Sequence, residues 1–222
     1  MGYHIDDEAM DLEALAERLE SCDPIPSHLP LLDGLREKLA TMGSAGVASV
    51  AALRRELKRP ASLSAFAGRT GITEGYLVLL RRAVEGWFPK PPSLSDFPGA
   101  DSAVVEALAR AGSLDARSLF EAAYAEPSRR ALAAAVGVGP ERLNELVALA
   151  DLSRLQWVSP AFARLLYDAG SAGTAAVAAA DGDSIYEAVR AINEDGRYFK
   201  GAIGKRDMAR LVSIARSLSR WT

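Results

Sequence analysis

Apolar residues recur every three or four positions along most of the chain, and this spacing is the period of an amphipathic α-helix. The stretch 143–150 shows it well, with Leu143, Leu146 and Ala150 on one helical face. The stretch 10–19 shows it too, with an acidic opposite face. Alternating apolar and polar residues, which are typical of strands, are nearly absent. The pattern therefore predicts an all-α fold.

Two glycines interrupt the helical pattern just before residue 143. Gly137 can adopt the left-handed conformation that ends a helix, and Val138 can then point inward between two helices. Pro140 suits the first position of the next helix, where its missing N–H is not needed. We therefore predict a helical hairpin, whose free N–H groups can hold a phosphate. The alternative is that the glycines only let two helices pack closely.

Glycine-ended helices and glycine turns recur in the same order along the chain. The expected helix ends are Gly43, Gly112 and Gly170, and the expected turns contain Gly71, Gly137 and Ala202. This order predicts three diverged copies of one helical unit of about sixty residues. The predicted segments are an acidic N-terminal arm and helix (1–30), a first unit (31–90), a second unit (91–154) and a third unit (155–222), with a linker at 89–92.

The composition limits the class of protein. Hydrophobic residues make up 49% of the 222 residues, which is ample for a core, and the net charge of −3 implies no particular partner. No apolar run is long enough to span a bilayer, and the acidic N-terminus does not resemble a secretory signal. The single cysteine, Cys22, fits a reducing compartment. We expect a cytoplasmic protein without a membrane partner.

Charge is distributed unevenly along the chain. Residues 1–28 carry eight acidic residues and one basic residue, whereas residues 36–90 carry ten basic and four acidic residues. Residues 91–196 carry fifteen acidic and eight basic residues, and residues 197–222 carry seven basic and one acidic. Two basic zones therefore flank an acidic middle. Such zones can attract phosphates, an acidic partner or the acidic segments of this same chain.

No catalytic or metal-binding constellation stands out in the sequence. The pair Gly204-Lys205 lacks the preceding glycine that a phosphate-binding nucleotide loop requires. His4, His28 and Cys22 are the obvious metal-ligand types, but their spacing matches no standard ligand pattern. We expect a protein that is not an enzyme and that holds neither a cofactor nor a metal.

Three turns resemble those of helix-hairpin-helix proteins, namely Phe97-Pro98-Gly99, Gly137-Val138-Gly139-Pro140 and Ile203-Gly204-Lys205-Arg206. The chain also resembles, over nearly all of its length, an uncharacterised bacterial family of such proteins that is known only as a domain of unknown function. The stretches 2–6, 25–27 and 31–35 carry this second resemblance. The helix-hairpin-helix resemblance implies sequence-independent contact between turn amides and a nucleic-acid backbone.

The last turn is the one that combines glycines with cations, whereas Asp101 and Glu141 bring negative charge to the two earlier turns. The predicted nucleic-acid contacts are Lys200, Gly201, Gly204, Lys205, Arg206 and Arg210 around the last turn, and Arg69, Arg81 and Arg82 in the first basic zone. We expect a non-catalytic module that binds DNA or RNA backbone. The residues leave open a protein-interaction scaffold, a homodimer formed through charge complementarity, and a turn whose cations only meet solvent.

Overall fold

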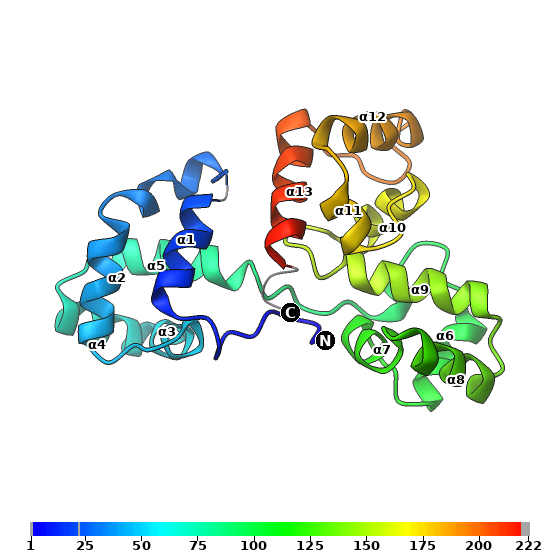
Figure 1. The fold of residues 1–222 in the computed structure, drawn as a ribbon, viewed down its shortest axis with the longest axis horizontal. Coiled ribbons are helices and arrows are strands. Elements are labelled where there is room, and N and C mark those ends of the chain that lie inside the picture. Colours follow the sequence, from blue (N-terminus) through cyan, green and yellow to red (C-terminus); the bar gives the residue numbers. More distant parts are fainter. Residues whose placement is uncertain (1, 22, 219–222) are drawn as a thin grey trace. The chain divides into compact units, whose positions relative to one another are not determined.

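A computed structural model describes residues 2–21 and 23–218, and its regular structure is helical (Figure 1). Within these residues no strand forms, and the only extended pairing is an isolated bridge between Ser93 and Asp115. The predicted all-α fold class is therefore confirmed.

The chain divides into two compact units. Among the described residues, unit 1 comprises 2–4 and 89–218, and unit 2 comprises 5–21 and 23–88. The chain thus leaves unit 1 after its first residues and returns to it at Pro89. The four segments expected from the sequence pattern stay a prediction.

All helices in both units are short. Unit 2 contains α1 (Leu12–Ser21), the 3-10 helix η1 (Pro26–Leu32), α2 (Leu35–Ser44), α3 (Val50–Leu57), α4 (Pro60–Thr70) and α5 (Glu74–Glu85). Unit 1 contains the 3-10 helix η2 (Leu94–Asp96), α6 (Ser102–Arg110), α7 (Ala116–Ala123), α8 (Glu126–Val136), α9 (Pro140–Leu152), α10 (Pro160–Asp168), α11 (Thr174–Ala179), α12 (Gly182–Ile192) and α13 (Lys205–Leu218). Short helices leave a large share of their backbone groups at helix ends, where other partners must be found.

From α2 onward the helices follow one another in three sets of four, α2–α5, α6–α9 and α10–α13. The third helix of every set has 11 residues. Behind the first helix of each set comes a glycine with positive φ, namely Gly46, Gly112 and Gly170 at 94°, 93° and 97°. The next residue then donates its N–H to a carbonyl five positions earlier, as Val47 does to Met42 at 3.1 Å. These bonds satisfy carbonyl groups that the helix end leaves free.

The glycine expectations are confirmed at two of the three helix ends. Gly112 and Gly170 follow the ends of their helices, as predicted, and both have positive φ. Gly43 was wrong as a helix end, because α2 continues to Ser44 and Gly46 adopts the left-handed conformation instead. A Cβ atom at Gly43 would lie 3.7 Å from Cδ1 of Leu12. Its position is therefore on the face that packs against α1.

The first residues of the chain are built into the core of unit 1. The Tyr3 side chain is fully buried, and its hydroxyl shares a hydrogen bond of 2.9 Å with Oγ of Ser153. Nε of Arg154 donates to the carbonyl oxygen of Tyr3 at 2.8 Å, and Nε2 of His4 lies 2.9 Å from the carbonyl oxygen of Pro89. Residues far apart in sequence therefore close unit 1 at the point where the chain leaves and re-enters it.

Burial of Tyr3 predicts a pH dependence of stability. Burial raises the pKa of Tyr3 from 10.0 to about 12, because the phenolate cannot be hydrated in the core. The contribution of the neutral Tyr3 phenol to the free energy of unfolding is complete below pH 10 and is lost as the pH rises through 12. At pH 11 the free energy of unfolding of unit 1 should be about 1 kcal/mol lower than at pH 9 from this group alone.

Urea denaturation of the wild type and Tyr3→Phe at both pH values measures this effect. The variant should lose less stability between pH 9 and pH 11 than the wild type does. Equal losses in the two proteins would contradict the buried position of the phenol.

A close backbone contact between α12 and α13 predicts a second effect. A Cβ atom at Gly182 would lie 2.8 Å from both N and Cα of Ala209. Gly182→Ala should therefore lower the free energy of unfolding by about 1–3 kcal/mol. Gly75→Ala in α5, where the added Cβ meets open space, should instead raise it by about 0.4–1 kcal/mol. Chemical denaturation followed by circular dichroism compares the two, and a neutral Gly182→Ala would show that the helices are not in contact here.

Candidate nucleic-acid interface

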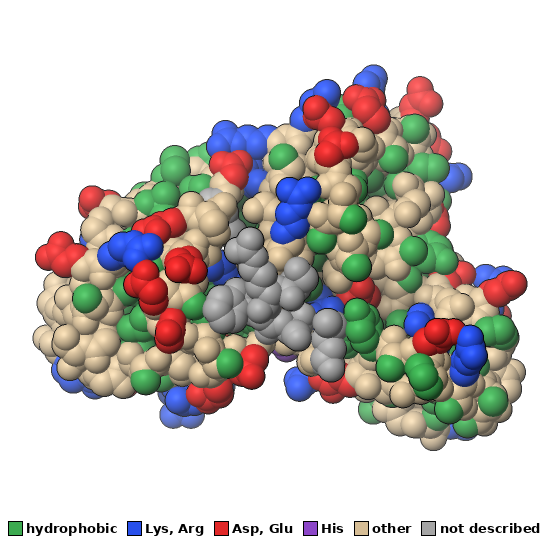
Figure 2. Space-filling model, in the orientation of Figure 1, with side chains coloured by type: hydrophobic (Ala, Val, Ile, Leu, Met, Phe, Trp, Pro, Cys, Tyr) green, Lys and Arg blue, Asp and Glu red, His purple; other side chains and the backbone are tan. Residues whose placement is uncertain are grey.

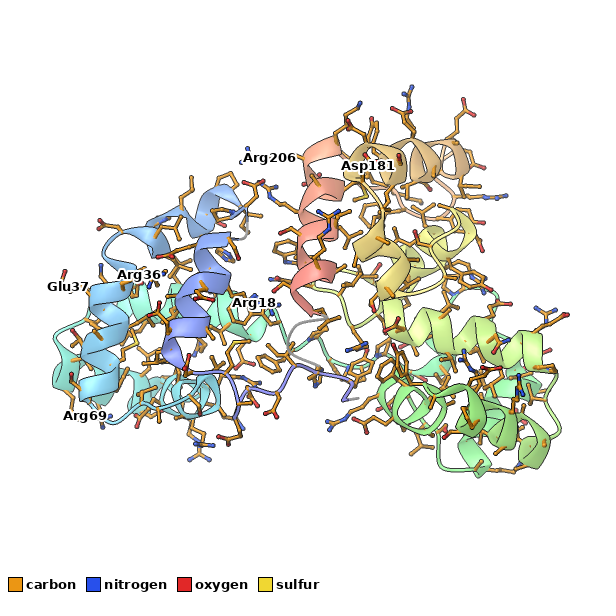
Figure 3. The ribbon with its side chains drawn as sticks, viewed as in Figure 1. Arg18, Arg36, Glu37, Arg69, Asp181 and Arg206 are labelled. Carbon is orange, nitrogen blue, oxygen red and sulfur yellow. The ribbon has the colours of Figure 1, made fainter. Side chains whose placement is uncertain are left out.

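The nine residues predicted to contact nucleic acid fall into two groups, one in each unit. In unit 1, Lys200, Gly201 and Gly204 lie in the loop between α12 and α13, and Lys205, Arg206 and Arg210 lie on α13. In unit 2, Arg69 lies on α4, and Arg81 and Arg82 lie on α5. Figure 3 labels one member of each group, Arg206 and Arg69. The final helix begins at Lys205, so the first three residues belong to the loop before it.

The turn before α13 is occupied by the chain's own carboxylates. Nζ of Lys205 lies 3.5 Å from Oδ1 of Asp183 and 3.9 Å from Oε1 of Glu187. The N–H of Gly204 donates to Oδ2 of Asp207 at 3.0 Å. An acidic side chain thus already satisfies a turn amide, and two others reduce the positive charge of the adjacent lysine.

The other residues of this group differ in exposure. Lys200 and Arg206 are exposed, whereas Arg210 is buried with 8% of its surface accessible. A Cβ atom at Gly201 would lie 2.5 Å from Cε1 of Phe199. This glycine therefore makes room for an aromatic ring.

The predicted residues of unit 2 also have partners within the unit. NH2 of Arg69 lies 3.2 Å from Oε1 of Glu56, and NH1 of Arg81 donates to the carbonyl oxygen of Leu57 at 3.3 Å. Arg82 is exposed beside Arg81 on α5. The three arginines therefore have different surroundings and do not form one uniform patch.

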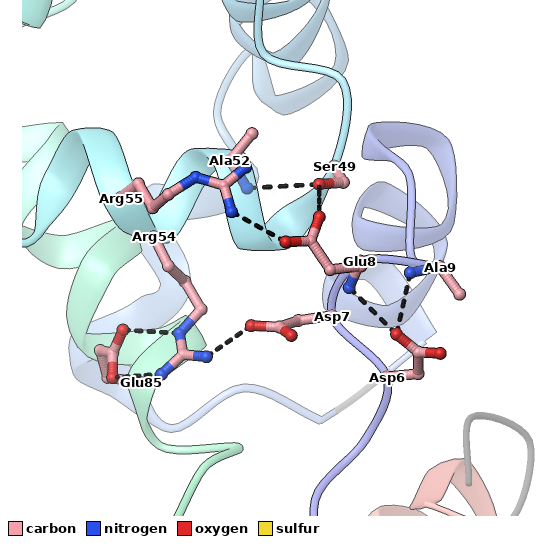
Figure 4. Close-up of polar contacts among 9 residues, drawn as sticks. All are labelled: Asp6, Asp7, Glu8, Ala9, Ser49, Ala52, Arg54, Arg55 and Glu85. Atoms are coloured by element: carbon pink, nitrogen blue, oxygen red, sulfur yellow. Dashed lines mark hydrogen bonds and ion pairs between the residues drawn. The ribbon is translucent and has the colours of Figure 1, made fainter.

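The acidic N-terminal arm neutralises part of the first basic zone (Figure 4). Arg54 donates to Oδ2 of Asp7 at 2.5 Å and to both carboxylate oxygens of Glu85 at 2.8 and 3.1 Å. Arg55 donates to Oε1 of Glu8 at 2.8 Å. On the face drawn in Figure 2, cations and carboxylates are likewise interspersed. The charge pattern left attraction of the chain's own acidic segment as one alternative, and these ion pairs show that attraction.

Four helices begin after a turn of the same form. In each turn, a residue with positive φ lies two positions before the N-cap residue of the helix. The turns are Gly71-Ile72-Thr73 before α5, Gly99-Ala100-Asp101 before α6, Gly137-Val138-Gly139 before α9 and Trp157-Val158-Ser159 before α10. The φ angles of the first residues are 69°, 78°, 66° and 68°. The left-handed conformation expected at Gly137 is confirmed.

The capping of these four helices separates one hairpin from the others. Side chains of Thr73, Asp101 and Ser159 accept hydrogen bonds from first-turn N–H groups, at 3.4, 2.9 and 3.2 Å for the shortest bond of each. At α9 the capping position is Gly139, and no described side chain caps this helix. A Cβ atom at either Gly137 or Gly139 would meet open space. The hairpin before α9 is therefore open to a ligand in a way that the three capped turns are not.

The hairpin at Trp157 was not anticipated from the sequence. Ser159 caps α10, and Pro160 lies in the first turn of that helix. The preceding turn was missed because the tryptophan occupies a position where the other three turns have glycine. The only available clue was the apolar Val158 directly before the Ser-Pro pair.

Comparison with known protein families finds a family model that matches this chain. The model of the family described as "Domain of unknown function (DUF4332)" matches residues 98–218, which is more than half of the chain and lies within unit 1. The chain belongs to this family of uncharacterised domains. The match does not include the stretches 2–6, 25–27 and 31–35, where a resemblance was also expected. Searches of curated proteins and of solved structures found no match.

Membrane-spanning helices and metal-binding clusters are both absent from the part of the chain that the structure describes. None of its helices is long and apolar enough to cross a membrane. None of its groups of three or more His, Cys, Asp or Glu side chains is arranged to hold a metal ion. His4 lies in unit 1 and His28 in unit 2, while Cys22 lies outside the described residues.

The backbone of Trp157 predicts that a glycine there stabilises unit 1. Trp157 is the one non-glycine residue of the described chain with positive φ, and its side chain is 57% exposed. Trp157→Gly should raise the free energy of unfolding by about 1 kcal/mol, because glycine has no Cβ to clash in this conformation. Chemical denaturation measures the change. A loss of stability would mean that packing of the indole outweighs the backbone strain.

Proposed function

We propose that this protein is a non-catalytic binding module that contacts a nucleic-acid backbone through the hairpin before α9. In this proposal the three sets of four helices are tandem helix-hairpin-helix-like units, and the protein is a cytoplasmic member of a bacterial family. The similar helix lengths and the four turns of one form support the proposed repeats.

The observation that carries the proposal is the open N-terminus of α9. The first N–H groups of a helix carry a partial positive charge and attract anions. At α9 the capping glycine supplies no side chain, so these groups remain directed at the surface. Gly137, Gly139 and Pro140 are all exposed. A phosphate could approach the backbone closely here because glycine has no Cβ in its way.

The charges around this hairpin imply weak binding. Pro140 has no N–H, and Glu141 brings a negative charge into the first turn. Arg142 is exposed and lies 3.6 Å from Glu145, so it can turn toward a phosphate at little cost. One hairpin with one arginine makes few phosphate contacts, so the affinity should be low and should fall with added salt only in proportion to those few contacts. Lys200 and Arg206, the exposed cations near the last turn, are the second candidate contact.

A substitution at the capping position tests the proposal without damaging the fold. Gly139 has φ of −59° and an open Cβ position, so Gly139→Asp can be accommodated. Aspartate should cap α9, raising stability by a few tenths of a kcal/mol, and should repel a phosphate. We expect the affinity for labelled DNA and RNA, measured by fluorescence anisotropy at low salt, to fall at least tenfold. Gly139→Ser, which adds a cap without a charge, is the matched control and should show a smaller loss.

The variant Lys205→Glu/Arg206→Glu tests the last turn in the same assay. If it loses binding and Gly139→Asp does not, the contact lies at the last turn and the hairpin before α9 is not the site. If wild-type protein shows no salt-sensitive binding to single- or double-stranded nucleic acid, the proposal is overturned. A protein partner or a homodimer would then be the remaining alternatives from the sequence.

A further inference from the structure

Unit 2 contains a cavity of about 510 Å³ between the N-terminal arm, α3 and α5. Four cationic side chains line it, Arg54, Arg55, Lys58 and Arg81. Three carboxylates from the arm and α5 line it as well. Its volume lies within the range of small-molecule sites, which is about 300–1,000 Å³. Its lining is charged, so a ligand for it must be charged too.

The carboxylates of this cavity are already paired. Asp7 and Glu85 both bind Arg54, whose guanidinium also lies 3.6 Å from the centre of the Phe88 ring. Figure 4 shows how these acidic groups converge on Arg54. Arg54 is therefore held from three sides and does not supply free positive charge.

The third carboxylate, Glu8, has two partners of its own. It binds Arg55 at 2.8 Å and accepts a hydrogen bond from Oγ of Ser49 at 3.3 Å. Both Glu8 and Arg55 are well exposed, with 64% and 66% of their side chains accessible. This ion pair is consequently weak, and Arg55 can be shared with a ligand.

The remaining cations, Lys58 and Arg81, carry the unneutralised charge. Lys58 is exposed and has no ion-pair partner within the described part of the chain. Arg81 donates one N–H to the carbonyl oxygen of Leu57, the last residue of α3 and the neighbour of Lys58. This bond fixes the guanidinium at the same helix end, and its other N–H groups remain available as donors. Two cations thus line one side of the cavity without a carboxylate to balance them.

The wall formed by the arm is firmly attached to unit 2. The N–H groups of Val50 and Ala51 donate to the carbonyl oxygens of Met10 and Asp7 at 2.8 and 2.9 Å. Ile5 and Met10 are buried. The N-terminus of α3 is therefore already occupied, and the cavity's attraction for anions comes from side chains rather than from that helix end.

We propose that this cavity binds a phosphate-bearing anion, with Lys58 and Arg81 as its main phosphate contacts and Arg55 as a shared one. An arginine presents several donors in a plane, and a lysine adds a point charge, which together suit phosphate oxygens. The volume leaves room for more than a single inorganic phosphate, so it can admit a larger phosphorylated molecule or a phosphate of a nucleic acid. The proposal does not rest on the hairpin before α9.

Isothermal titration calorimetry of the full chain with pyrophosphate tests the site. Lys58→Gln should weaken binding at least tenfold, and Arg81→Gln should do the same. Arg82→Gln removes an equal charge from the next residue, which does not line the cavity, and should leave the affinity unchanged. Glu8→Gln should tighten binding two- to threefold, because Arg55 then loses its competing carboxylate. Circular dichroism of each variant checks that the helices are retained.

The outcomes show whether the site binds phosphate at all and, if it does, whether that phosphate belongs to a nucleic acid or to a free molecule. No saturable binding of pyrophosphate at millimolar concentration, or equal binding by wild type and Lys58→Gln, would overturn the proposal. If a short DNA duplex displaces pyrophosphate and Lys58→Gln abolishes this competition, the site takes nucleic-acid phosphates. If the duplex has no effect while pyrophosphate binds, it takes a free phosphorylated molecule. Gly139→Asp should bind pyrophosphate normally in either case, which keeps this test independent of the first.

Discussion

The satisfaction of backbone groups at helix ends is the constraint on which this structure depends. The α-helices of the described residues have only 6 to 14 residues, so unpaired N–H and C=O groups make up much of each one. Left-handed glycines satisfy the carbonyl ends, and side chains of Thr73, Asp101 and Ser159 satisfy the amide ends. Another part of the chain can supply further acceptors, as the N-terminal arm does for Val50 and Ala51 of α3 beside the Ser49 cap. Among the four turns of one form, the hairpin before α9 is the one without a capping side chain, and this makes it the candidate site.

Buried charge explains why the first residues of the chain are part of unit 1. The Arg154 side chain is almost fully buried and pairs with Asp151 at 2.7 Å, and Asp151 in turn accepts the N–H of Thr174 at 2.7 Å. A buried guanidinium must also use its remaining donors, because an unpaired charged group in a core is strongly unfavourable. The carbonyl oxygens of Gly2 and Tyr3 accept them. The region matched by the family model therefore depends on residues that lie outside the match.

Charge pairing within the chain decides which basic residues can act on a partner. Asp7 of the arm and Glu85 neutralise Arg54, whereas Arg55 forms only an exposed, weak ion pair with Glu8. Lys205 is close to Asp183 and Glu187. A basic stretch of sequence is thus a poor guide to a basic surface, because the neutralising groups come from other helices. The two proposed anion sites reflect this distribution. One relies on the backbone amides of α9 in unit 1, and the other on the side chains that remain unpaired in unit 2.

Local rules were enough to predict much of this architecture. The helical period and the left-handed Gly137 depend on residues a few positions apart, and both are found as expected. Prediction failed where distant contacts decide. Gly43 lies inside α2, on the face that packs against α1. Trp157 adopts a backbone conformation that its residue type disfavours. Tyr3 is buried against Ser153, which is 150 positions away in the sequence. Distant contacts also decide which helix-end amides stay open and which cations stay unpaired. Sequence periodicity describes one helix at a time, whereas these properties arise only when side chains from several helices meet.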